Sequence, residues 1–166
     1  MLKAYQNHFP IVHATAKVFD GAVCVGNVHL SADVGVWHQA TLRADMAEII
    51  IGEGTNVQDH TVIHTDTNQP TVIGRFVTIG HKAIVHACTV HDHALIGMGA
   101  LLLNGCIIEE GAMVAAGTLV PPGKVVPKGH LAMGSPMKII RPLTETEIQK
   151  NKENAQTYIF LKNTHG

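Results

Sequence analysis

The second half of the sequence repeats an aliphatic residue at every sixth position. This series runs from Ile73 to Val126 and is interrupted by one shorter step after Val85. A period of six fits neither a helix face nor simple strand alternation, because each repeat holds a short strand and a turn that small residues permit. Together with looser repeats that begin at Leu30, the series covers about 100 residues and predicts a parallel β-helix. The repeated positions are Ile73, Ile79, Val85, Val90, Ile96, Leu102, Ile108, Val114, Val120 and Val126.

Three repeats are expected to close one triangular coil. Stacked coils would pair their strands in parallel and bury a ladder of valine, isoleucine and leucine along the axis. An aromatic content of only 4% suits such narrow packing. A β-sandwich, the competing all-β architecture, needs turn signals every roughly 8 to 12 residues and is disfavoured.

We expect an all-β domain, the hexapeptide-repeat β-helix of residues 1–135, followed by a C-terminal extension, residues 136–166. The extension leaves the repeat, and Thr144 with Glu147 has the spacing of a capping box that opens an α-helix. This helix is predicted to pack back along the coils and to cover a sheet edge that would otherwise invite strand addition. Its apolar side is expected at Ile148, Ala155, Ile159 and Phe160.

The charge pattern argues against nucleic acid or an anionic membrane as a partner. The net charge is -1, and no run of lysine or arginine could follow a phosphate backbone. The N-terminus lacks the apolar stretch of a signal peptide, and no segment approaches the roughly 20 apolar residues of a membrane span. We therefore expect a cytoplasmic protein with no membrane partner.

Cysteine and histidine carry most of the remaining chemistry. Cys24, Cys88 and Cys106 are widely spaced and form no CxxC pair, so we expect them to be small core residues rather than zinc ligands or disulfides. The 12 histidines are a surplus that requires a chemical or structural explanation.

The repeat acts as a ruler for these histidines, because equal positions three repeats apart lie one above another at the strand spacing of about 4.8 Å. Counting repeats places Arg43, His64 and His86 in one column on one face. A single histidine in such a protein is commonly a surface or turn residue, but two stacked histidines favour a metal site. His91 and His93 are the rival pair, although their face offers no third histidine. The column follows directly after Leu42, Ile63 and Val85.

His81 falls on the neighbouring face with Gln58 and Asp59, around a corner from His64 and His86. A three-fold symmetric trimer would bring that face of one subunit against the histidine column of the next. Three neutral imidazoles leave one coordination position open, as a catalytic zinc requires. Water there would have its pKa lowered to about 7 and yield a hydroxide that attacks a small electrophile such as CO2. Ferrous iron or cobalt could also occupy such a site.

At these residues the chain resembles the γ-class carbonic anhydrases. Three segments carry the resemblance: LRAD at Leu42–Asp45, NVQDHTVIH at Asn56–His64 and IGHKAIVHAC at Ile79–Cys88. The resemblance implies a left-handed β-helix, against the usual right-handed crossover rule, and a homotrimer that converts CO2 to bicarbonate. It also implies that His64 and His86 of one subunit bind the metal with His81 of a neighbour.

The resemblance assigns further roles beside the metal. Arg43 and Asp45 would form an intersubunit pair, Gln58 would orient the attacking hydroxide, and Asn56 and Asp59 would support that network. Tyr158 is similar to a family tyrosine near the active site. The alternative without a function is that Arg43 and Asp45 form a surface ion pair and Tyr158 only packs against the coils. The polar residues Asn56, Gln58 and Asp59 would then be turn formers.

The sequence departs from the archetypal pattern where protons leave the site. Met46 stands where the family has a glutamate, and the inserted loop His64–Thr71 contains no glutamate. Turnover faster than about 10⁴ s⁻¹ needs a proton relay, because a group with a pKa near 7 releases protons to water only about that fast. We therefore expect low activity, with His38 as a candidate substitute relay.

Two other functions remain open. A hexapeptide acyltransferase or thioesterase would use acyl-CoA, and the segment Gly134–Pro142 fits that class equally well. Such enzymes need no set of three histidines. A non-catalytic metal-binding trimer is the second alternative.

Overall fold

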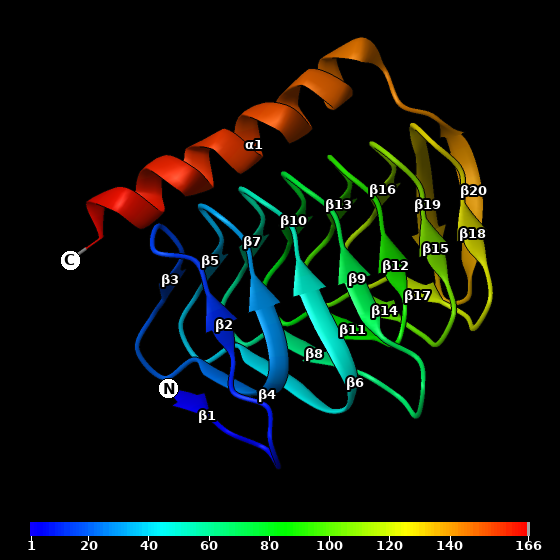
Figure 1. Cartoon of the computed structure of the whole chain (residues 1–166). Helices are drawn as coiled ribbons and strands as arrows, with labels where there is room; N and C mark the ends of the chain where they lie inside the picture. The colour runs from blue at the N-terminus through cyan, green and yellow to red at the C-terminus, as the bar shows by residue number, and fades with distance from the viewer. Residues whose placement is uncertain (166) are drawn as a thin grey trace.

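The computed structural model, which describes residues 1–165, is a parallel β-solenoid with one long helix lying along it (Figure 1). We name its three sides face A, face B and face C. The strands β4 (Val23–Leu30) and β6 (Thr41–Ile51) turn the corner from face A to face B and join them into one 12-stranded sheet. The predicted parallel β-helix is confirmed.

Each face stacks short strands from successive coils. Face A also contains β1 (Leu2–Lys3), β8 (Val62–His64), β11 (Ile84–His86), β14 (Leu101–Leu102) and β17 (Leu119–Val120). Face B also contains β2 (Ile11–Val12), β9 (Thr71–Ile73), β12 (Thr89–Val90), β15 (Ile107–Ile108) and β18 (Val125–Val126). Face C is the eight-stranded sheet of β3 (Lys17–Val18), β5 (Gly35–Val36), β7 (Asn56–Val57), β10 (Thr78–Ile79), β13 (Leu95–Ile96), β16 (Met113–Val114), β19 (His130–Gly134) and β20 (Met137–Pro142).

The solenoid begins earlier than the repeats indicate. Strands β1 and β2 pair in parallel with β4, and β3 pairs with β5, so the chain is already coiled before Leu30. The six-residue period does not reveal this coil, because a turn closed between Tyr5 and His8 interrupts the spacing.

The repeated aliphatic residues form the core. All ten positions from Ile73 to Val126 are at most 1% exposed, and burying one such side chain contributes about 1.5–3 kcal/mol. All three cysteines are buried, as predicted. The turns recur every six residues with a left-handed backbone that glycine adopts without strain. Their φ angles lie between 63 and 68° at Gly99, Gly105, Gly111, Gly117, Gly123 and Gly129.

Helix α1 (Glu145–Thr164) begins beside the last coil and ends beside the first, so both termini lie at one end of the solenoid (Figure 1). The predicted capping box is present, and the helix packs on β5, β7 and β10 of face C. On face C, the sheet edge at the last coil is covered by β20, which pairs antiparallel with β19, and not by the helix.

The apolar side predicted for α1 is wrong at Phe160, which is 64% exposed. Lys162 is buried instead, and its ammonium group donates to the Thr15 carbonyl oxygen at 2.6 Å and to Asp33 Oδ1 at 3.0 Å. The helix rests on turns that carry backbone oxygens and carboxylates, so a lysine with two acceptors fits this contact better than a phenyl ring.

The capping glutamate supplies a pH prediction. Hydrogen bonds from Arg141 and from the Thr144 backbone amide lower the pKa of Glu147 from 4.5 to about 2. Because the folded-state pKa is depressed, this contribution to stability is complete above the unfolded pKa and is lost as the pH falls toward 2. We expect the free energy of unfolding to fall more over that window in the wild type than in Glu147→Gln. A carboxyl NMR titration that finds the pKa of Glu147 near 4.5 would contradict this.

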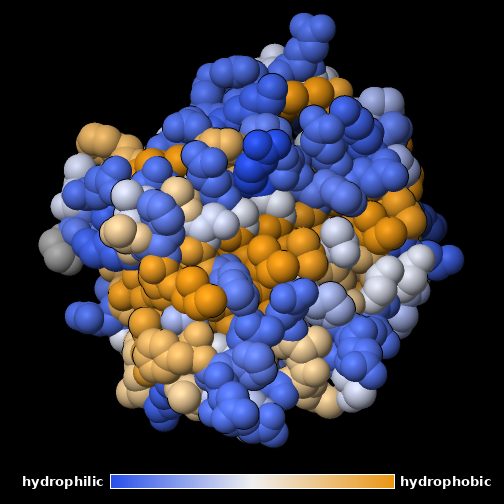
Figure 2. Space-filling model, in the orientation of Figure 1, coloured by the Kyte–Doolittle hydropathy of each residue, from blue (hydrophilic) through white to orange (hydrophobic). Residues whose placement is uncertain are grey.

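Figure 2 shows an apolar band across the middle of the molecule, in the orientation of Figure 1. Outward positions of face B include the exposed side chains of Ile11, Ile107 and Val125.

In residues 1–165, no helix is long and apolar enough to cross a membrane.

Candidate metal centre

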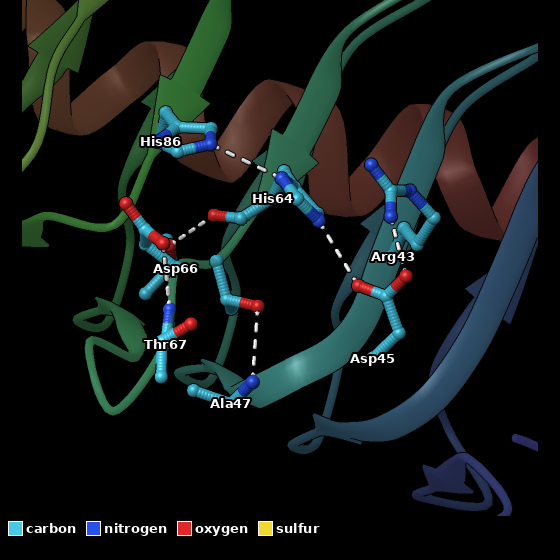
Figure 3. Close-up of polar contacts among 9 residues, drawn as sticks. Arg43, Asp45, Ala47, His64, Asp66, Thr67 and His86 are labelled. Carbon is cyan, nitrogen blue, oxygen red and sulfur yellow. Dashed lines mark hydrogen bonds and ion pairs between the residues drawn. The ribbon is translucent and has the colours of Figure 1, made fainter.

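His64 and His86 lie on adjacent rungs of face A, at the ends of β8 and β11, as the repeat count predicts. Leu42, Ile63 and Val85 precede the column and pair in register beneath it. The ring atoms His64 Nδ1 and His86 Nε2 face each other at 3.1 Å (Figure 3).

Asp45 holds the opposite side of the His64 ring. Its Oδ1 lies 3.0 Å from His64 Nε2, and its Oδ2 pairs with the Arg43 guanidinium (Figure 3). Partial burial acts to raise the pKa of Asp45, but the hydrogen bonds from His64 and Arg43 outweigh it and hold the pKa below its usual value. Because the ionised carboxylate only accepts, His64 Nε2 carries the proton, and in the neutral ring Nδ1 presents its lone pair toward His86.

Asn104 holds the outer nitrogen of His86, and our sequence analysis missed it. Its Oδ1 lies 2.7 Å from His86 Nδ1. Asn104 belongs to the turn after β14, on the next coil of the same face. Extending the column by one coil beyond His86 would have led to this turn.

His81 lies in the turn after β10, at the edge of face C. Its Nδ1 is 2.9 Å from Asp59 Oδ2, so this histidine also has a carboxylate partner. The buried Gln58 donates from Nε2 to Asn56 Oδ1 at 3.0 Å, and Asn56 donates in turn to the Thr78 hydroxyl at 3.0 Å.

Tyr158 reaches this second cluster from α1. It lines a groove of about 350 Å³ together with Gln58 and His81. Burial, and secondarily the charge of Asp59, raise the pKa of the Tyr158 hydroxyl. His38 lies one rung from Asp59, and its Nδ1 is 3.1 Å from the Asp20 carbonyl oxygen.

The predicted residues therefore form two half-sites. Arg43, Asp45, His64 and His86 meet on face A, whereas the cluster around His81 belongs to face C. Among residues 1–165 of a single chain, no three histidine, cysteine or acidic side chains gather closely enough to hold a metal ion. The face C half-site consists of Asn56, Gln58, Asp59, His81 and Tyr158.

The donor chemistry of both halves suits a divalent metal. Each of the three histidines donates one ring N–H to an oxygen acceptor and keeps the other nitrogen free, the arrangement of metal-binding histidines in proteins. The 3.1 Å between His64 Nδ1 and His86 Nε2 is a little shorter than the roughly 3.3–3.4 Å that separates two nitrogens bound at about 2.0–2.1 Å to one tetrahedral ion. When both rings are neutral and protonated on their outer nitrogens, two lone pairs face each other at this distance and repel, and a cation beside them removes that repulsion.

Relatives cover nearly the whole chain. It is 47% identical over 154 residues to the "Probable carbonic anhydrase" of Methanocaldococcus jannaschii, an alignment that covers 93% of this chain and 97% of that protein. It is 39% identical to a carbonic anhydrase of Geobacillus kaustophilus, covering 96% and 87%. It is 40% identical to the mitochondrial gamma carbonic anhydrase 2 of Arabidopsis thaliana, covering 94% of this chain and 58% of the plant protein.

A solved structure of a hexapeptide transferase family protein from Anaplasma phagocytophilum is similar at 42% identity, with a TM-score of 0.96 and coverage of 99% and 98%. No family model matches the sequence. The coiled repeats and the histidine column define a hexapeptide-repeat protein of the β-helix class. Its relatives narrow this further, and the chain belongs to the γ-class carbonic anhydrase family.

Proposed function

We propose that this protein is a carbonic anhydrase that hydrates CO2 to bicarbonate at a metal site shared between subunits of a homotrimer. The observation that carries the proposal is the division of the histidines. His64 and His86 present free nitrogens on face A. His81 lies on face C, where one of its ring nitrogens contacts the carboxylate of Asp59. A symmetric trimer would set face A of one subunit against face C of the next and so bring the two halves together.

Face A has the composition of a subunit contact. Val62 and Ile84 point outward two residues before His64 and His86, and they are 40% and 41% exposed. Large apolar side chains exposed beside polar ligands are typical of interfaces in symmetric oligomers. This exposure supports the trimer.

A divalent metal bound there, zinc or ferrous iron, would supply a hydroxide nucleophile at neutral pH. The chain's own residues would do the rest. Arg43 and Asp45 orient the His64 ring. One amide N–H of Gln58 already donates to Asn56 Oδ1, so the carbonyl oxygen of Gln58 is the group available to accept a hydrogen bond from the nucleophile and orient it.

Proton release is the expected weak step. Met46 is 48% exposed at the position where a carboxylate could carry protons out of the site. The Asp66 carboxylate of the inserted loop is already hydrogen-bonded to Thr67 and Asn104. We expect turnover below about 10⁴ s⁻¹, the limit without a relay. A cytoplasmic location remains a prediction from the sequence.

Stopped-flow CO2 hydration tests the proposal, with protein loaded with zinc or, anaerobically, with ferrous iron. We expect activity with close to one metal per chain. Gln58→Ala should lower kcat roughly 100-fold, the size of effect of losing one oriented polar group, at unchanged metal content. The control Gln149→Ala changes an exposed helix residue and should be neutral.

The acyltransferase or thioesterase reading is kept because the Anaplasma phagocytophilum protein of the same fold is called a hexapeptide transferase. Acetyl-CoA turnover without CO2 hydration would favour it. Bound metal with neither activity would leave a metal-binding trimer.

A further inference from the structure

Asn104 connects His86 to the inserted loop that follows His64. Its Oδ1 lies 2.7 Å from His86 Nδ1, and its Nδ2 donates to Asp66 Oδ2 at 2.7 Å. All three side chains come from different segments, because Asp66 lies in the loop after β8 and Asn104 lies two coils further along face A.

Asp66 determines which way the Asn104 amide points. A carboxylate only accepts hydrogen bonds, so the amide nitrogen must face Asp66 and the amide oxygen must face His86. The opposite orientation would place two oxygen acceptors against each other.

The loop holds the Asp66 carboxylate in place. Its Oδ1 accepts the Thr67 backbone N–H at 2.7 Å. Asp66 and Gln69 exchange two backbone hydrogen bonds at 2.9 and 3.1 Å that close the turn. The Thr71 hydroxyl donates to the His64 carbonyl oxygen at 2.6 Å and ties the end of the loop back to its start.

We propose that Asn104, oriented by Asp66, is a positioning residue that keeps the proton of His86 on Nδ1 and leaves Nε2 free to bind metal. An acceptor at one ring nitrogen decides which nitrogen remains unprotonated. Asp45 does the same for His64. As a result the two free nitrogens, His64 Nδ1 and His86 Nε2, face each other 3.1 Å apart. The inference rests on the proposed function, because it deepens the role of the same metal site.

Three variants test this. Asn104→Leu removes both amide groups at nearly constant volume. The double variant Asn104→Asp/Asp66→Asn exchanges the two side chains, so that an oxygen still faces His86 and an amide still bonds to the oxygen at position 104. Asn163→Leu makes the same substitution at an exposed position of α1 as a control.

Two measurements are needed. Competition with a chromophoric chelator gives the zinc dissociation constant, and ¹⁵N NMR of histidine-labelled, metal-free protein shows which nitrogen of His86 is protonated. We expect Asn104→Leu to weaken zinc binding roughly 10- to 100-fold and to move the His86 proton toward Nε2. The double variant should restore both readings, and the control should change neither.

Wild-type zinc affinity in Asn104→Leu would overturn the inference, as would weaker binding with an unchanged His86 proton. If Asn104→Leu does not fold, the double variant decides: failure to keep the Nδ1 proton overturns the inference, and retention supports it. The outcome is separable from the proposed function. A wild-type protein that binds no metal would end the proposed function. The NMR measurement on metal-free protein would still show whether Asn104 keeps the proton of His86 on Nδ1.

Discussion

Replacing His81 with alanine is expected to abolish both metal binding and CO2 hydration while the fold and the oligomer persist. The same result is expected for His64→Ala, because each substitution removes one of only three nitrogen ligands. The changes lie at the surface of the solenoid, outside its aliphatic core, so thermal unfolding of the metal-free protein should be little affected. Elemental analysis and stopped-flow assays measure the two losses.

The two inactive variants should rescue each other when mixed. If subunits of His64→Ala and His81→Ala are unfolded together and refolded in equal amounts, three quarters of the trimers contain both. Each mixed trimer joins one intact face A to one intact face C at one of its three interfaces, so about one quarter of wild-type activity should return. A site completed within one chain predicts no recovery.

His91→Ala, at an exposed position, provides the control for this experiment. It should retain full metal content whether refolded alone or mixed. A His81→Ala protein that still binds one zinc per chain with wild-type affinity would remove His81 from the site and with it the argument for a trimer.

Replacing Ile108 with alanine should destabilise the protein by about 2–5 kcal/mol, the usual cost of removing a large aliphatic side chain from a packed core. Ile108 is 0% exposed and stands in the ladder between Val90 and Val126, where the coils above and below cannot collapse into the space left. Denaturant unfolding gives the change in free energy.

Ile107→Ala is the matched control, since it removes the same atoms from the same strand on the outward side. Ile107 is 36% exposed, and we expect a cost below about 1 kcal/mol. A larger cost at Ile107 than at Ile108 would show that the strand register is displaced by one residue, and equal costs would contradict the assignment of one side chain to the core and the other to the surface.

Local pattern determined much of this architecture. The period of six sets which residue of each repeat points inward, so the pairing of Leu42, Ile63 and Val85 could be predicted by counting. The capping box of α1 is similarly local, because Thr144 and Glu147 are only three residues apart.

The same reasoning failed where spacing carries no information. The coil before Leu30 lies within the expected β-helix domain, but its strands could not be placed because irregular turns interrupt the period. On α1 the position of Phe160 was misjudged, although Ala155 is buried as expected. Part of the contact surface consists of polar turns, so Lys162 is buried and Phe160 is not.

For the histidines, the sequence by itself determined that His64 and His86 share a column and that His81 lies around a corner. Only the tertiary structure decided which nitrogen of each ring is engaged, through Asp45, Asp59 and Asn104. The physical reason is that a strand–turn period places backbones along one axis. The direction and partner of a side chain depend on neighbours one or two coils away, which the period does not specify.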